Sequence, residues 1–199
     1  MAVVLSLFVL LIGTACAMTF TERMPPLKGE IAVGAPRSQA RVLLALDGAF
    51  TSYRHTMYLG DHYVYEMGAM FSAGAEDVVR ALFTEVTIGG SGSPTTNAEL
   101  VVTPRVAAVR MSPFEGSAFQ KRVATVAIEW TIRDATGQTV WLDTVEGEGS
   151  SDVGTPFTRG TRAAERLRLA SGAAFRNAVE RIREAPEVQQ WLRQTPDRK

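Results

Sequence analysis

Two kinds of hydrophobic pattern in the chain predict strands. The fold is expected to begin at Ala40, and the run from Val42 to Leu46 is apolar at consecutive positions, which is typical of a strand covered on both faces and placed inside its sheet. Residues 122–134 instead alternate between apolar and polar, which predicts a strand with one face buried and the other exposed to solvent. Its core side carries Ala124, Val126, Ile128, Trp130 and Ile132.

Two other segments repeat apolar residues at steps of three and four, which predicts helices that pack one stripe on a sheet. The first begins at Met67, with a stripe formed by Phe71, Ala75, Val78, Leu82 and Val86. The second spans residues 158–185 and ends before Pro186; its stripe of mostly small residues is Ala163, Leu167, Ala170, Ala174, Ala178 and Ile182. After it, Val188, Trp191 and Leu192 are expected to fold back as an apolar plug.

Three successive strands are expected between residues 98 and 151. Pro104 interrupts the first, and because proline has no amide donor for a strand ladder, this indicates an edge position or a bulge. Residues 134–137 form a short hairpin turn, so the three strands make an antiparallel meander. The order of elements predicts an α+β fold with a mostly antiparallel sheet and two main helices packed on one face.

The N-terminus indicates export. Residues 2–12 carry no charge and are too few to span a hydrocarbon core, which takes about 20 apolar residues. A secretory signal fits this length. The segment Ile12-Gly13-Thr14-Ala15-Cys16 resembles the lipobox of bacterial lipoproteins, which implies that Cys16 is lipidated and becomes the mature N-terminus. An ordinary signal peptide with an incidental cysteine is the alternative.

This resemblance determines the domain organisation and the subcellular location that we expect. Residues 1–15 are a lipoprotein signal peptide, 16–39 a lipidated N-terminus and flexible tether, 40–195 a single α+β periplasmic domain, and 196–199 a loose tail. Two or three acyl chains would hold such a domain on a membrane almost irreversibly. In the resembled family the residue after the cysteine sorts the protein, and Ala17 implies the outer membrane, with the domain on its periplasmic face.

Composition excludes few classes of function. Formal net charge is zero, and this gives no indication of nucleic-acid binding. Charge is uneven, however, because residues 158–199 hold ten Lys and Arg against five Asp and Glu. A basic helix face of this kind is usually solvated, and contact with anionic headgroups or an acidic partner is the alternative.

Residues 48–66 contain both histidines and all four tyrosines. Tyrosine offers a large rigid surface with a polar tip and is enriched at interfaces, so Tyr53, Tyr58, Tyr63 and Tyr65 are candidate partner-binding residues. Packing of this segment over the sheet is the other interpretation. The segment also contains side chains of the kinds that coordinate metal ions, His55, Asp61, His62 and Glu66. Their spacing matches no metal-binding motif, so no metal is expected.

No catalytic residue is predicted, and the chain is expected not to be an enzyme. The serines lack a Gly-x-Ser-x-Gly elbow, and the segment GGSGSPTTN lacks the Gly-Lys-Ser/Thr ending of a phosphate-binding loop. Glu146 and Glu148 lie two residues apart, a spacing compatible with a general acid and a general base. Their position at a solvent-exposed strand end accounts for two glutamates equally well. No cofactor is predicted.

The phrases AELVVTPRV, RDATGQTVW, VEGEG and VQQWLRQ, in that order after a lipobox, are similar to YajG-type outer-membrane lipoproteins and more loosely to auxiliary lipoproteins of ABC-type transport systems. The resemblance implies a non-enzymatic envelope assembly, scaffold or interaction protein with an envelope protein partner. The alternative is an auxiliary lipoprotein of an ABC-type lipid or envelope-molecule transport system, which would need an apolar groove between sheet and helices.

Overall fold

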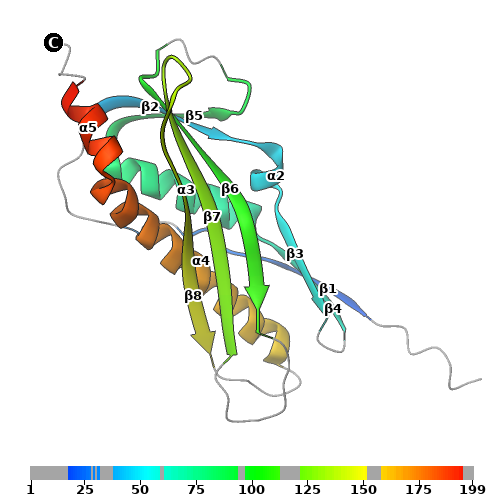
Figure 1. The fold of residues 1–199 in the computed structure, drawn as a ribbon. Coiled ribbons are helices and arrows are strands. Elements are labelled where there is room, and N and C mark those ends of the chain that lie inside the picture. Colours follow the sequence, from blue (N-terminus) through cyan, green and yellow to red (C-terminus); the bar gives the residue numbers. More distant parts are fainter. Residues whose placement is uncertain are drawn as a thin grey trace, which may run out of the picture.

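A computed structural model describes residues 18–27, 29, 31, 38–58, 61–93, 97–112, 122–151 and 158–194. These residues form an α+β fold with two sheets (Figure 1). The larger sheet has five strands in the order β5-β2-β6-β7-β8. Its strands are β2 (Ser38–Leu46), β5 (Phe83–Gly90), β6 (Leu100–Met111), β7 (Arg122–Asp134) and β8 (Thr139–Ser151).

Most paired residues of the large sheet are antiparallel, because the long strands β6, β7 and β8 form the expected meander. The strand β2 lies between β5 and β6 and pairs with both in parallel. Residues 42–45 of β2 are all buried, which confirms a strand that is covered on both faces. The hairpin turn places Gly137 at φ 87°, a backbone conformation that glycine adopts without strain.

Two main helices pack together on one face of this sheet, α3 (Gly68–Leu82) and α4 (Arg159–Glu184) (Figure 1). Phe175 of α4 joins the layers, since its ring meets Trp130 of β7 edge-on at 6.2 Å and Phe71 of α3 at 6.1 Å. The short helices α2 (Gly48–Thr51) and α5 (Pro186–Gln194) complete the fold, and α5 buries Val188. No described helix is both long and apolar enough to cross a membrane.

The phrase VEGEG has a packing role in this fold. A methyl group on Gly147 would collide with the backbone of Ala170 and Ala174, and one on Gly149 with the backbone of Arg166 and Ala170. The glycines of β8 therefore face the small residues of α4, and the two backbones lie in close contact. This fit explains why the stripe of α4 consists mostly of alanine.

Two predicted boundaries need correction. The helix α3 ends at Leu82, so Val86 belongs to strand β5 and not to the helical stripe. The strand β2 begins at Ser38, two residues before the expected start. The expectation of an edge at Pro104 holds locally, because β6 pairs with β2 only as far as Val102. The register irregularity of β6 is not at Pro104, which pairs with Trp130, but between Val106 and Ala108.

The prediction that residues 17–39 form a flexible tether is wrong for its first part. Thr19–Arg23 form strand β1, which pairs in parallel with a strand from the tyrosine-rich segment. Met24, Leu27 and Ile31 are at most 2% exposed and belong to the core. These three core residues could not be recognised from the sequence, because they stand singly among prolines and glycines. Isolated apolar residues at such spacing produce no helical or strand period.

Candidate functional site

The tyrosine-rich segment is a β-hairpin that the N-terminal strand extends into a second, three-stranded sheet. Strands β3 (Arg54–Tyr58) and β4 (His62–Glu66) are antiparallel, and β1 adds to the other side of β4, giving the order β1-β4-β3. This sheet, which we call the arm, projects beside the helical layer (Figure 1). Its tip is the end at His62, where Thr19 and Tyr58 pair with that residue from either side.

The pairing register assigns each arm residue to one of two faces, because neighbouring residues in a strand point to opposite sides. Phe20, Glu22, Tyr63, Tyr65 and His55 share the face that meets the body of the protein. The other face is largely exposed and carries Thr19, Thr21, Arg23, Arg54, Thr56, Tyr58, His62, Val64 and Glu66. On it, Glu66 pairs with Arg54 at 2.8 Å and with Arg23 at 3.4 Å.

The four candidate tyrosines have different surroundings. Tyr65 is fully buried, and its hydroxyl donates a hydrogen bond to the Gly160 carbonyl oxygen at 3.2 Å, so it is a packing residue and cannot be a contact residue. Tyr53 is half-buried and its ring lies 5.5 Å from that of Phe71. Tyr63 is half-buried as well, whereas Tyr58 is 64% exposed at the tip.

Burial also determines the titration of this face. It raises the pKa of Tyr65, which the negative charge of Glu22 raises further, and it raises the pKa of Glu22 itself. Burial lowers the pKa of His55, because a charged imidazole loses hydration there. The inner face of the arm therefore favours the neutral forms of these groups.

The sequence interpretation missed Met18 and Phe20, which it assigned to the tether. Phe20 stacks on Tyr63 at 5.2 Å between ring centroids and is still 45% exposed. Met18 is 64% exposed, and its backbone binds Asp61 and His62. Both residues lie at the tip, and their alternation with Thr19 and Thr21 is a weak strand signal that is visible only when residues 18–23 are considered together. The lipidation candidate, Cys16, lies outside the described residues.

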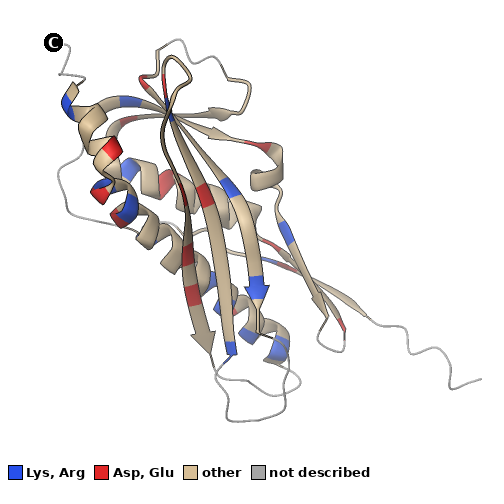
Figure 2. Cartoon of the chain, viewed as in Figure 1, with Lys and Arg blue, Asp and Glu red and all other residues tan. Residues whose placement is uncertain are grey.

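The first turn of α4 lies beside the inner face of the arm. A side chain on Gly160 would collide with the Tyr63 ring, so glycine permits this close contact. Arginines gather at this end of the molecule (Figure 2). Arg122 at the start of β7 has a pKa lowered by burial and by the positive charge of Arg159. Arg166 is 3% exposed, and its Nε and Nη1 have no hydrogen-bond partner among the described residues.

The candidate metal ligands are not brought together. His55 and His62 lie on opposite faces of the arm, so they cannot share an ion. Among the residues with described positions, no group of three or more His, Cys, Asp or Glu side chains could hold a metal.

Glu146 and Glu148 lie on the solvent-exposed outer face of β8. Glu146 binds Arg110 at 3.0 Å, so its carboxylate forms an ordinary ion pair on an open face. The glycine-rich segment begins inside β5, where Gly89 and Gly90 pair with Ala45 and Leu46. This geometry favours structural roles for both motifs.

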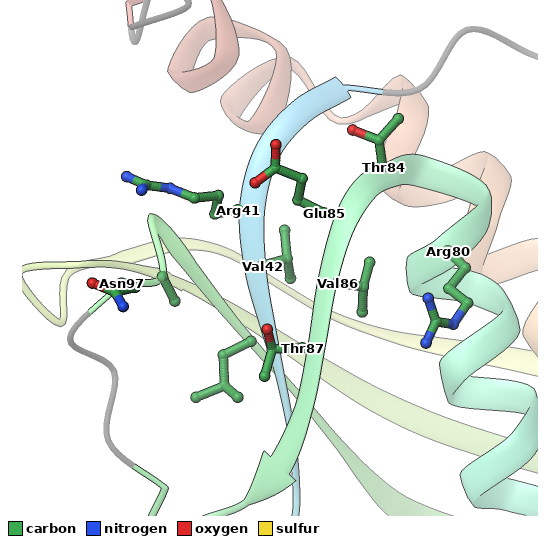
Figure 3. A pocket seen from close by; sticks show the side chains of 10 residues that line it. Arg41, Val42, Arg80, Thr84, Glu85, Val86, Thr87 and Asn97 are labelled. Atoms are coloured by element: carbon green, nitrogen blue, oxygen red, sulfur yellow. The ribbon is translucent and has the colours of Figure 1, made fainter.

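An open pocket of about 490 Å³ lies along β2 and β5 (Figure 3). Arg41 and Arg80 lie on either side of the two strands, and each already binds a glutamate, Glu99 at 3.6 Å and Glu76 at 2.8 Å. A smaller pocket of about 60 Å³ lies near α5 between Leu82, Ile182 and Leu192. The interface between α4 and β8 is closed by their glycine and alanine backbones, so it does not provide the apolar groove that a lipid carrier would need.

No family model matches the sequence, and no curated protein is similar enough to be counted as a match. Solved structures with a similar chain path include a Xanthomonas campestris protein assigned to family DUF330, at 15% identity and a TM-score of 0.48, covering 89% of this chain and 100% of that one. A minor lipoprotein from Acinetobacter baumannii has 10% identity and a TM-score of 0.45, over 74% and 92%. A hypothetical protein from Chlamydia trachomatis has 11% identity and a TM-score of 0.45, over 73% and 95%.

Proposed function

We propose that this chain is a non-enzymatic lipoprotein of the bacterial cell envelope, held by acyl groups on Cys16 at the periplasmic face of the outer membrane. Its role is that of a scaffold or interaction protein that binds an envelope protein through the arm. The lipobox-like segment before Cys16 supports the anchor. The observation that carries the proposal is strand β1, which begins three residues after Cys16 and is paired along its length with β4.

This pairing connects the anchor to the fold. If residues 17–39 were a free tether, the domain would be held far from the lipid in no fixed orientation. Because β1 belongs to the arm, an acylated Cys16 instead presents the arm at a defined place next to the membrane. An anchored scaffold benefits from that arrangement, since its contact surface is held in one position.

The partner surface that we propose is the outer face of the arm at its tip. Tyr58 is 64% exposed there, and its ring lies 5.2 Å from that of His62. An exposed tyrosine supplies contact area at a low cost in side-chain entropy. Tyr53 and Tyr65 are excluded from this surface, because their rings already pack in the body of the protein.

Replacement of Cys16 tests the anchor. Cys16→Ser removes the only cysteine, so the protein should move from the membrane fraction to the soluble periplasm, and the lipid mass of the wild type should be lost. Mass spectrometry and membrane flotation measure the two effects. A variant that floats with the outer membrane as fully as the wild type, together with a wild type that carries no lipid, would refute the anchor.

Replacement of Tyr58 tests the partner surface. Tyr58→Ser should leave the melting temperature unchanged and abolish co-purification of envelope proteins from detergent-solubilised native membranes. Leu142→Ser is the matched control, because Leu142 is 59% exposed on the outer face of β8, away from the arm. If the Tyr58→Ser and Leu142→Ser variants co-purify the same amount of envelope protein, the arm is not the partner surface. Co-purification of a permease, an ATPase and a substrate-binding protein would instead select the transport role.

A further inference from the structure

The inner face of the arm and the first turn of α4 together present apolar and basic residues at one end of the molecule. Phe20 and Met18 are exposed at the arm tip, and Phe20 stacks on Tyr63. Tyr63 in turn lies against Gly160 of α4. The first turn of α4 also carries Arg159 and Arg162, and the Arg162 side chain, which is 44% exposed, binds Glu165 at 2.7 Å. We call Met18, Phe20, Tyr63, Arg159 and Arg162 the aromatic–basic end.

We propose that the aromatic–basic end rests on the phospholipid headgroup layer of the membrane that holds the anchor, so that Met18 and Phe20 enter the interface and the arginines bind anionic headgroups. This inference rests on the proposed acylation of Cys16. It adds a second, reversible membrane contact to the covalent one, and it fixes which end of the protein faces the lipid.

Covalent geometry limits how far this end can be from the lipid. Two residue steps separate Cys16 from Met18, and a fully extended chain spans at most about 7 Å over two steps. The headgroup region of one leaflet is roughly 5 to 7 Å thick, from the difference between the hydrocarbon core and the whole bilayer. A lipidated Cys16 therefore holds Met18 in or beside the headgroup layer in every conformation of the linker.

The chemistry of the aromatic–basic end fits that depth. Aromatic rings are enriched at the boundary between headgroups and acyl chains, and apolar side chains that are exposed to water gain by entering it. Arginines near a surface of anionic lipid are attracted to it over about a Debye length. Arg122 lies at the same end, because it pairs with Ser151, whose hydroxyl donates a hydrogen bond to the Arg162 carbonyl oxygen. Its pKa is lowered by burial and then by the like charge of Arg159, so it adds positive charge at this end.

The position of Leu142 shows that exposure alone does not define such a surface. Leu142 is exposed near the β7–β8 turn, whereas Ser151 at the other end of β8 donates a hydrogen bond from its hydroxyl to the Arg162 carbonyl oxygen. The β7–β8 turn, next to Leu142 in sequence, thus lies at the end of the sheet opposite to the first turn of α4 (Figure 1). Leu142 provides a matched position that should stay in water.

Depth-dependent fluorescence quenching tests this inference on the acylated, full mature protein. Phe20→Trp and Leu142→Trp are each reconstituted in phosphatidylcholine vesicles that contain phosphatidylglycerol and a phospholipid brominated on its acyl chains. Relative to the wild type, whose three tryptophans set the background signal, the tryptophan at position 20 should be strongly quenched and the one at position 142 should not. Omission of phosphatidylglycerol should weaken the quenching at position 20.

The outcomes separate this inference from the anchor. A protein that carries the lipid mass but shows no quenching in Phe20→Trp keeps the anchor and overturns the docking. Quenching only in brominated vesicles that also contain extracted envelope proteins, and not in protein-free vesicles, assigns the surface to a protein and also overturns the docking. If the wild type carries no lipid, sedimentation with vesicles that contain phosphatidylglycerol, lost in Phe20→Ser and kept in Leu142→Ser, would retain the docking without the anchor.

Discussion

The Tyr65 hydroxyl donates a hydrogen bond to the Gly160 carbonyl oxygen at 3.2 Å, across 95 residues of sequence. Tyr65 is fully buried, and Gly160 has no side chain to obstruct the neighbouring Tyr63 ring. The arm and the first turn of α4 are therefore packed as one unit. Changes inside this junction should affect global stability, whereas changes at the exposed tip should not.

Replacement of Tyr65 measures the strength of this junction. Tyr65→Phe loses the hydrogen bond and should lower the free energy of unfolding by about 1 kcal/mol. Tyr65→Ala also leaves a cavity and should lower it by roughly 3 to 5 kcal/mol. Urea denaturation gives both values. Tyr58→Ala is the control, and a loss there as large as in Tyr65→Ala would contradict the separation of junction and tip.

Substitution of Gly147 tests the close contact of β8 with α4. Gly147→Ala places a methyl group against the backbone of Ala170 and Ala174, and this strain should cost about 1 to 3 kcal/mol of stability. Gly92→Ala is the matched control, because nothing lies within 4 Å of the position of its methyl group. If thermal melts of the two variants coincide, the helix does not lie as close to the strand as described.

A charge in the stripe of α4 should be far more costly than the loss of one on its surface. Ala174 is fully buried against the sheet, so Ala174→Asp would bury an unpaired carboxylate and should cost several kcal/mol or prevent folding. Arg176 is exposed on the same helix, and Arg176→Ala should change stability by less than about 0.5 kcal/mol. Circular dichroism melts compare the two, and small, equal shifts would refute the packing of this face.

His55 should make stability depend on pH. Burial lowers its pKa below the ordinary value of 6.5, so the unfolded chain binds the proton more tightly than the folded protein does. The free energy of unfolding should thus be highest above pH 6.5 and fall as pH decreases through that value toward the folded-state pKa. His55→Gln should reduce this fall. His62→Gln, which removes an exposed histidine of the same arm, should retain it.

Much of the fold was predictable from local pattern. The continuous apolar run identified β2 as an interior strand, strict alternation identified β7, and steps of three and four identified α3 and α4. Each pattern reports how many faces of an element are buried, which depends mainly on neighbouring residues in the chain. The α+β class and the antiparallel meander followed from their order.

The arm could not be derived in this way. Strand β1 holds no continuous apolar pattern of its own, and it exists because β4, much later in the chain, offers an unpaired edge to it. The separation of Tyr65 from Tyr58 likewise depends on which face of the hairpin meets α4, and four similar tyrosines carry no sign of that choice. Sequence by itself determined where the elements lie and which of their faces are apolar. Only the tertiary structure decided which surfaces stay exposed, because that depends on segments far apart in the chain that pack together.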